Sequence, residues 1–581
     1  MDEKVDRLYE LLPTVYQQQD EARGYPLRDL LRVIAEQVDV VEADIDQLYE
    51  NWFIETCQDW VVSYIGALVG YRPVLETGPP DYAPAARARQ QYRTLVPRRE
   101  VADTIRNRRR KGTLALLEEL AADVAGWPAR AVEFYMRLGW LQAMQHVRPE
   151  VGRTVDVRHG DALDRLDGPF DELAHTVDVR RINSRLTQGR YNIPSVGLFV
   201  WRLKVYPISY ASAYCLEERG EHCYTFSVLG NDSPLYTLLE PEAKPTSIAG
   251  ELNLPVPIRR RALAARLEDY YGPGKSFQIW IGDPPQLVPA DRVMVADLAD
   301  WQYQPPRGKV AVDPEQGRMT FNEDDPPHDG VWVSYHYGFS AGIGGGEYKR
   351  SLPHLSDAAL YRVGVQEEIQ DINEALAKWR ADVPDRAVIE ITDSGDYLIS
   401  GDEVSAYGRS RERFHVKLRP NQILHLRAAN RARPVIRLLD WRTNQPDALR
   451  ITGEPGSRFT LDGLLVSGRG LNIEGDLAEV GIRHVTLVPG WTLGSERQPQ
   501  PPAEPGLVLS NTPARVTIAH SIIGSIQVNQ DEVKTEPIPI QISDSVLDAT
   551  DNEQEALGAP GWPLAHAVLT VLRSTVIGQV Q

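Results

Sequence analysis

The chain has few cysteines and no long apolar segment, and each absence limits what the protein is. Its 581 residues include three cysteines, Cys57, Cys215 and Cys223. Three thiols make no disulfide framework, which favours a reducing compartment. No apolar run approaches the roughly 18 residues of a membrane-spanning helix, and residues 1–10 are charged and lack an apolar signal core. We therefore expect assembly in the cytoplasm without direct membrane insertion.

Positive charge is also in deficit. The chain carries 63 basic and 81 acidic residues, a formal net charge of −18. An acidic surface of that size argues against nucleic acid as a partner. The hydrophobic fraction of 42% allows sizeable cores, and a length prior of roughly 150 residues per domain suggests about four domains.

Strong catalytic and metal-binding motifs are missing. The sequence contains no GxSxG, no HExxH and no paired CxxC. His222 and Cys223 lie near Cys215, but three ligands without a fourth make a poor zinc site. The acidic turn at residues 324–329, with Asp324, Asp325, His328 and Asp329, is either a calcium site or a solvated hairpin, and we favour the hairpin. We expect no catalytic residue, no metal and no cofactor, and hence no enzyme.

The most informative pattern present is a heptad stripe near the amino terminus. Large apolar residues alternate in steps of four and three, and polar residues, many of them acidic, lie between them. A period of 3.5 keeps one seam on one side of a helix and favours winding around other helices. The alternative is an ordinary core helix. We predict a partner-binding bundle seam formed by Leu27, Leu31, Ile34, Val38, Val41, Ile45, Leu48 and Trp52.

A short basic run follows in the next helical segment. It contains Arg106, Arg108, Arg109, Arg110 and Lys111. Such a run can dock an acidic partner helix, which makes it a candidate secondary interface. The alternative is a solvated helix face, which is commoner for a short charge run.

From about residue 190 to 340 the hydrophobic period changes to two. Apolar residues alternate with polar ones at 199–205, 277–281 and 331–337, which predicts half-buried antiparallel strands. Residues 313–317 read as a hairpin turn. The glycine-rich segment 342–346 lacks the Gly-Lys-Ser/Thr ending of a phosphate loop, so we expect a flexible or tightly turned connection.

The last 200 residues show short strands in an irregular repeat. Steps of 21, 36, 24 and 29 residues separate the equivalent positions Leu464, Val485, Ser521, Ser545 and Ser574. Coils of about 20 residues or more with variable loops are typical of a parallel β-helix. An amphipathic helix over 360–380, with Ile369, Ile372, Leu376 and Trp379 on one face, should cap the first coil. The last coil stops at Gln581 in mid-pattern, which indicates either stacking on another chain or a longer chain.

These patterns predict a multidomain α+β protein. We expect a helical region with a coiled-coil-like bundle helix, then a β-rich mixed domain, then a linker with a capping helix, then a right-handed parallel β-helix. The expected boundaries are 1–150, 151–350, 351–384 and 385–581.

Several segments together resemble the phage tail protein I family. They are residues 11–16 (LLPTVY), the heptad helix, 52–57 (WFIETC), 64–66 (YIG), 108–113 (RRRKGT) and 191–197 (YNIPSVG). The resemblance covers roughly the first 350 residues, and the β-helix departs from the shortest family members.

The resemblance implies a structural role. Members of that family are baseplate wedge subunits of contractile phage tails and related contractile injection systems. Each joins two copies of a second wedge protein in a helical bundle, and the wedges surround a hub and spike beneath the sheath. The chain would then belong to a phage-tail-like particle that couples baseplate rearrangement to sheath contraction. Whether the particle is a phage, a released particle or a membrane-attached device stays open.

The alternative function is a tailspike-like β-helix that binds or cleaves polysaccharide. Two carboxylates about 5 to 9 Å apart can cleave a glycosidic bond, and the candidates are Asp393, Asp396, Asp402, Glu403, Asp544 and Asp548. Carbohydrate binding would instead use exposed aromatic residues, here Trp441, Trp491 and Trp562.

Overall fold

The structure is a computed structural model that describes residues 7–73, 93, 95–139, 143–146, 157–179, 189–242, 244, 246–328, 330–400, 415–440, 445–446, 448–488, 492–493, 499–500, 504–530 and 536–581. Contacts divide the chain into two compact units. The first contains residues 1–154, 174–200 and 242–249, and the second contains 155–173, 201–241 and 250–581. Among the described residues, no helix has both the length and the apolar character needed to cross a membrane.

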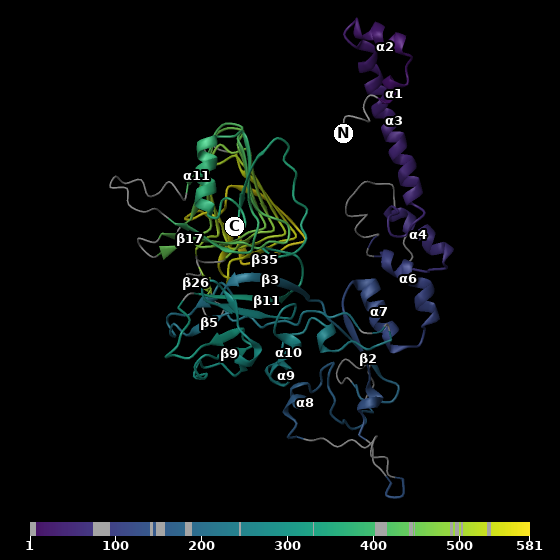
Figure 1. Ribbon diagram of the computed structural model, residues 1–581, viewed down its shortest axis with the longest axis vertical. Helices are drawn as coiled ribbons and strands as arrows, with labels where there is room; N and C mark the ends of the chain where they lie inside the picture. The colour runs from purple at the N-terminus through teal and green to yellow at the C-terminus, as the bar shows by residue number, and fades with distance from the viewer. Residues whose placement is uncertain are drawn as a thin grey trace. The chain divides into compact units, whose positions relative to one another are not determined.

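The first unit is helical at its amino end, as predicted. Its helices are α1 (Arg7–Glu10), α2 (Thr14–Glu21), α3 (Pro26–Glu50), α4 (Asp59–Leu68), α6 (Arg98–Arg109) and α7 (Leu114–Ala125). The longest is α3, drawn in purple in Figure 1. A small core of Cys57, Val61, Val62, Val96 and Val101 lies where α4 and α6 meet. After α7, the strand β1 (Ala129–Glu133) pairs antiparallel with β2 (Val196–Val200).

The second unit begins with two sheets that share one core. The four-stranded sheet is antiparallel and runs in the order β3 (Lys204–Ser212), β11 (Val331–Phe339), β6 (Gln278–Ile281) and β7 (Gln286–Leu287). The five-stranded sheet runs in the order β4 (Tyr214–Cys215), β5 (Cys223–Thr225), β10 (Arg318–Thr320), β9 (Val310–Asp313) and β8 (Val293–Val295). The short helices α8 (Gly160–Asp164), α9 (Arg260–Ala265) and α10 (Leu267–Tyr270) complete this part.

The strands near 199–205, 277–281 and 331–337 are confirmed with one correction. The first run is two strands, because residues 201–203 interrupt it and β2 and β3 belong to different sheets. The hairpin at 313–317 is confirmed, since β9 and β10 pair antiparallel across it. The five-stranded sheet is mixed rather than antiparallel throughout, because β8 and β9 are parallel.

The carboxyl-terminal region consists of three parallel sheets in a β-helix-like arrangement. The first sheet contains β12 (Ala359–Val363), β13 (Arg386–Ile391), β16 (Ile423–Ala428), β20 (Arg458–Asp462), β23 (Glu479–Arg483), β28 (Arg515–Ala519), β31 (Ile538–Ser543) and β34 (Ala567–Leu572). The second contains β14 (Asp396–Ser400), β17 (Val435–Asp440), β21 (Leu465–Ser467), β24 (Thr486–Leu487), β29 (Ile522–Ile523), β32 (Val546–Asp548) and β35 (Thr575–Ile577). The third contains β15 (His415–Leu418), β19 (Leu449–Gly453), β22 (Leu471–Gly475), β27 (Leu507–Ser510), β30 (Ile526–Asn529), β33 (Glu555–Gly558) and β36 (Gln579–Val580).

The strand register confirms the repeat read from the sequence. Leu465, Thr486, Ile522, Val546 and Thr575 are successive partners in the second sheet. Each follows directly after one of the five positions taken as equivalent. Alternate residues of most of these strands face one continuous apolar core, as a period of two requires, whereas the strands of the last coil are more exposed. The longest step, of 36 residues, contains the small hairpin of β25 (Thr492–Leu493) and β26 (Pro499–Gln500).

A helix covers one end of the three sheets, as expected. Figure 1 shows α11 (Ile372–Asp382) beside the sheets, and its buried side chains include Ile372, Leu376 and Trp379. The prediction of a helix from residue 360 is wrong for its first part. Residues 359–363 form β12, which pairs in parallel with β13, because five consecutive residues there continue the sheet instead of turning away from it.

A glycine-rich strap joins the two parts of the second unit. In residues 342–350, the N–H of Gly344 donates to the carbonyl of His520, and the N–H of Gly345 donates to Thr486 Oγ1. A Cβ at Gly345 would lie 2.8 Å from the backbone of Leu464, so close packing requires glycine there. The tight connection predicted from sequence is a strap packed on the turns of the parallel sheets.

Candidate functional site

Seven of the eight residues of the predicted bundle seam lie on α3, whereas Trp52 lies in the turn that follows the end of that helix at Glu50. A carboxylate from α2 fixes where α3 begins. Asp20 is buried, and its two oxygens accept hydrogen bonds from the backbone N–H groups of Leu27 and Arg28, at 2.7 and 3.0 Å. Those groups belong to the first turn of α3 and have no partner within the helix. Pro26 occupies the first helical position, where its missing N–H costs nothing.

Asp20→Ala is expected to destabilise the first turn of α3 by about 1 kcal/mol, because two N–H groups lose their acceptor. Hydrogen exchange at the amides of Leu27 and Arg28 should accelerate about fivefold. Asp29→Ala is the matched control, because Asp29 lies in the same turn without capping it. Equal acceleration in both variants would contradict the capping role.

The other end of α3 is attached to the core of the first unit. One guanidinium, that of Arg98, donates from the start of α6 to the carbonyls of Ile54 and Cys57, at 2.8 and 2.6 Å, and pairs with Asp59 at 3.2 Å. Burial raises the pKa of the Cys57 thiol, which therefore stays protonated at neutral pH. These contacts attach the segment that follows α3 to the packed core of the first unit.

Most of the seam is exposed in the isolated chain. Leu27 and Leu31 are half-buried beside α1 and α2. From Ile34 onward the side chains lie in solvent, with exposed fractions of 37% at Val38, 59% at Ile45 and 82% at Trp52. A helix that packed its seam into the core of its own chain would bury these positions, so the structure does not place them in an intramolecular core.

A second apolar line on α3 was not anticipated from the heptad pattern. Val33 and Val40 are also exposed, and they are seven residues apart. At 3.6 residues per turn they lie about 120–140° around the helix from Ile45. Their spacing in the sequence was the available signal. One helix with two apolar lines can contact two neighbours.

The exposed area sets the scale of the free energy that burial of the seam contributes to association. Full burial of one large apolar side chain contributes about 1.5–3 kcal/mol, so the six roughly half-exposed residues from Ile34 to Trp52 would contribute on the order of 6 kcal/mol. Association itself costs about 4–15 kcal/mol. Burial of this seam therefore offsets the lower part of that cost, and the apolar surface that a partner helix buries in return would add to it.

The basic run of α6 divides into two groups. Arg106 and Arg110 bind Glu119 of α7, with 3.0 Å between Arg106 Nη2 and the carboxylate, and this hydrogen bond raises the pKa of Arg106. Arg108 donates to the last carbonyls after α4, those of residues 69 and 70. Arg109 and Lys111 are exposed and make no ion pair with any residue that the structure describes. Three of the five cations thus have intrachain partners.

The carboxylates of the first coil have structural partners. Asp393 accepts hydrogen bonds from two backbone N–H groups and from the hydroxyl of Tyr397. Asp396 lies 2.6 Å from an arginine of β17. Asp402 and Glu403 lie outside the described residues. Both described carboxylates, Asp393 and Asp396, are therefore engaged in contacts within the fold.

The later carboxylates are also engaged. Asp544 binds the guanidinium of Arg573 through both oxygens at 2.6 Å, and this contact holds the pKa of Asp544 below its usual value. Asp548 accepts a turn hydrogen bond from the N–H of Thr550. A carboxylate with a lowered pKa cannot serve as a general acid at neutral pH.

The other candidates separate in space. Cys215, His222 and Cys223 do not bring three ligand atoms together, and burial raises the pKa of both thiols. In the acidic turn, Asp324 pairs with Arg307 at 2.8 Å, and Asp329 lies outside the described residues. Trp441 and Trp491 also lie outside them, whereas Trp562 is exposed.

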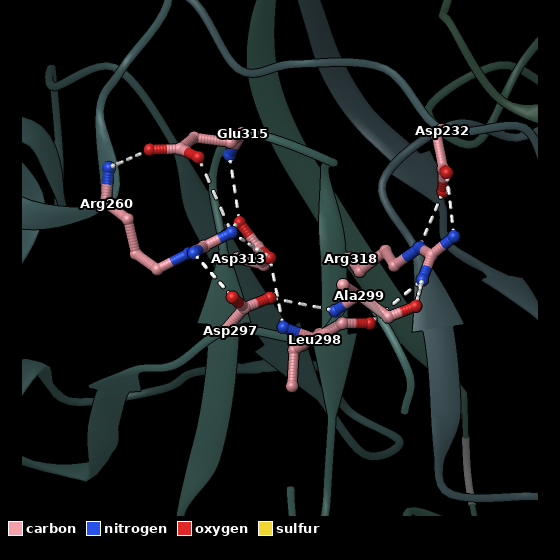
Figure 2. Close-up of polar contacts among 8 residues, drawn as sticks. All are labelled: Asp232, Arg260, Asp297, Leu298, Ala299, Asp313, Glu315 and Arg318. Carbon is pink, nitrogen blue, oxygen red and sulfur yellow. Dashed lines mark hydrogen bonds and ion pairs between the residues drawn. The ribbon is translucent and has the colours of Figure 1, made fainter. Parts of the chain in front are cut away.

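The five-stranded sheet holds a polar network in which several charged side chains lie close together. These side chains bind one another and the backbone. Figure 2 shows Asp313, which is fully buried, accepting from Arg260 at 2.9 Å and from the N–H of Leu298 at 3.0 Å. Arg318 forms two 2.7 Å hydrogen bonds with Asp232 and donates to two backbone carbonyls. Because their charges are paired within the fold, these groups have little capacity left for a substrate.

The exposed seam of α3 is therefore the candidate site that we pursue. Comparison with protein-family models, curated proteins and solved structures finds no match to this chain.

Proposed function

We propose that this chain is a structural, non-enzymatic baseplate wedge subunit of a contractile, phage-tail-like injection machine. The observation that carries the proposal is the exposed seam of α3, from Ile34 to Trp52. Its heptad spacing suits a coiled-coil bundle, and the second line at Val33 and Val40 suits a second partner helix. Two copies of a second wedge protein would supply those helices. The resemblance of several amino-terminal segments to the phage tail protein I family supports the same role.

In this proposal the mechanism is mechanical. The bundle anchors the subunit in the wedge, near the hub and spike and neighbouring wedges, and the wedge holds the base of the extended sheath. Rearrangement of the baseplate then passes the trigger to sheath contraction. The carboxyl-terminal sheets would form a right-handed parallel β-helix that extends outward. Arg109 and Lys111, which are exposed, would form the secondary contact.

Purification of the tagged chain from its native cells tests this function. We expect sheath, tube and a second wedge protein in the mass spectrum of the captured material, and tailed particles in negative stain. Recovery of the chain alone, under conditions that keep such particles intact, would overturn the proposal.

A carbohydrate-binding role is the second candidate, and one cleft favours it. Trp562 is 63% exposed and borders a cavity of about 310 Å³ that Asn511, Asn529 and Gln530 also line. An exposed indole with nearby amides suits stacking and hydrogen bonding to a sugar. If this role holds, Trp562→Ala should abolish binding on a glycan array, whereas Trp60→Ala, at another exposed indole, should not. Absence of glycan binding by the unmodified chain would exclude it.

A further inference from the structure

A cleft opens where the capping helix ends over the first coil. It has a volume of about 430 Å³ and lies between the carboxyl end of α11, the strand β15 and the turn that follows β15. A cavity of this size is within the range of small-molecule sites. Its polar and charged lining includes Trp379, Arg380, His415, Lys417, Arg419 and Glu454.

The lining is positive in a chain that is acidic overall. Three cations and one carboxylate give it a charge of about +2. The carboxyl end of α11 contributes roughly −0.5, which leaves the cleft positive. Burial, and next the charge of Lys417, lowers the pKa of His415, so this ring is neutral at pH 7. Lys417 and Arg419 are exposed and form no ion pair with any residue in the described part of the chain.

A buried donor also lacks a partner. Trp379 is 2% exposed, and its indole N–H makes no hydrogen bond to any described residue. Leaving such a donor unsatisfied costs about 1–3 kcal/mol. Its neighbour Gln422 is satisfied, because its oxygen accepts from the N–H of Arg419 and its amide donates to the carbonyl of Pro384. Among these two lining residues, the side-chain donor of Trp379 is thus the one without a partner among the described residues.

We propose that this cleft binds a small anionic ligand, with its phosphate or carboxylate group between Lys417 and Arg419 and with the indole N–H of Trp379 as a further donor. Two neighbouring cations can form charge-assisted hydrogen bonds to one oxyanion, and the unpartnered N–H of a residue that lines the cleft offers a further neutral donor. The volume accommodates a phosphorylated or oxidised monosaccharide. The site is independent of the α3 seam and of the wedge function.

Three sugars with the same ring test the proposal on the full chain. Calorimetry should detect binding of glucose 6-phosphate or glucuronate and none of glucose, and the comparison of the two acids distinguishes phosphate from carboxylate. Lys417→Glu with Arg419→Glu should weaken binding at least about 30-fold. Trp379→Phe keeps an aromatic side chain, although a smaller one, and removes the donor, so it should weaken binding about two- to tenfold. The Trp379 indole proton signal, assigned from that variant, should shift downfield in the complex.

The matched control is Arg515→Glu, which reverses another exposed cation on β28, away from the cleft. It should leave affinity unchanged. Three results would overturn the proposal: no binding of either acid at millimolar concentration, equal binding of glucose, or equal weakening by Arg515→Glu. Circular dichroism of each variant separates lost binding from lost folding.

Discussion

Val38→Asp combined with Ile45→Asp is expected to weaken association with the partner helices at least about 1000-fold. Both residues lie in the middle of the α3 seam and are exposed in the free chain, so neither supports its own core. In a bundle both would become buried, and each new carboxylate would lose its hydration without gaining a partner, at several kcal/mol per charge. The measurement is co-purification of the variant with sheath and wedge proteins, together with particle counts in negative stain.

Ala43→Asp provides the control for this variant. Residue 43 lies two positions before Ile45 and about 160° around the helix from it, on the exposed acidic face. The substitution adds the same charge and replaces the best helix former with a poorer one. It should nevertheless leave assembly intact. Normal particles from the double variant, or equal loss with Ala43→Asp, would contradict the seam assignment and leave α3 as an ordinary surface helix.

The parts of the fold that the sequence predicts are those with a regular period. The heptad stripe identified α3, and the spacing of Leu464, Val485, Ser521, Ser545 and Ser574 identified the coils before any strand pairing was known. In both cases apolar residues recur with each helical turn or each coil, because every turn and every coil must present apolar side chains to the same neighbour.

Long-range polar contacts were beyond the reach of that reasoning. Glu347 accepts hydrogen bonds from Ser209 of β3 and from Ser394 in the first coil, and so ties the two parts of the second unit together. Asp20 caps a helix that begins six residues later. Nothing periodic marks either residue, and an acidic side chain is most often solvated. Only the distance between the partners reveals these roles.

Only part of the candidate site could be predicted from the sequence. The heptad identified which residues form the seam, but not that they stay exposed, because a period of 3.5 is the same in a core helix and in an interface. The intrachain partners of Arg106 and Arg110 were also hidden, since Glu119 comes from the next helix. A run of basic residues in the sequence shows which side chains could bind an acidic partner, but it does not show which of them already form ion pairs within the chain.

The largest stability effect is expected at Arg350, which ends the glycine-rich strap. Its side chain is fully buried and donates to backbone carbonyls, including those of Gly346 at 3.0 Å and Ala429 at 2.7 Å. The carboxylate of Asp462 lies 3.8 Å away, is 2% exposed, and receives no hydrogen bond from any described residue. Burial raises the pKa of Asp462 to about 6, although the cations Arg350, Arg483 and Arg427 oppose the shift.

The raised pKa fixes the direction of the pH dependence. In the unfolded chain an aspartate titrates near 3.9, so the folded state holds this proton more tightly. The stability that this gives is complete below about pH 4 and is lost as pH rises through about 6, by an amount on the order of 3 kcal/mol. Asp462→Asn should remove this loss of stability. The measurement compares the unfolding midpoints of the unmodified chain and of the variant at pH values from 4 to 8.

Arg350→Met is then expected to destabilise the second unit by about 3–5 kcal/mol at pH 8, because a buried carboxylate loses its nearest cation and several carbonyls lose their donor. At pH 5 the loss should be smaller, since Asp462 keeps its proton, and adding Asp462→Asn should recover part of it at pH 8. Arg573→Met breaks an exposed pair with Asp544, so its effect should be small and should fade as pH decreases, because the pKa of Asp544 is lowered. The Arg573→Met effect should be the same at pH 8 and pH 5 and fade only below about pH 4, so chemical unfolding at pH 8 and pH 5 separates these cases. If the loss caused by Arg350→Met were the same at both, Asp462 would not be the group that Arg350 stabilises, and the strap would be held by its backbone contacts alone.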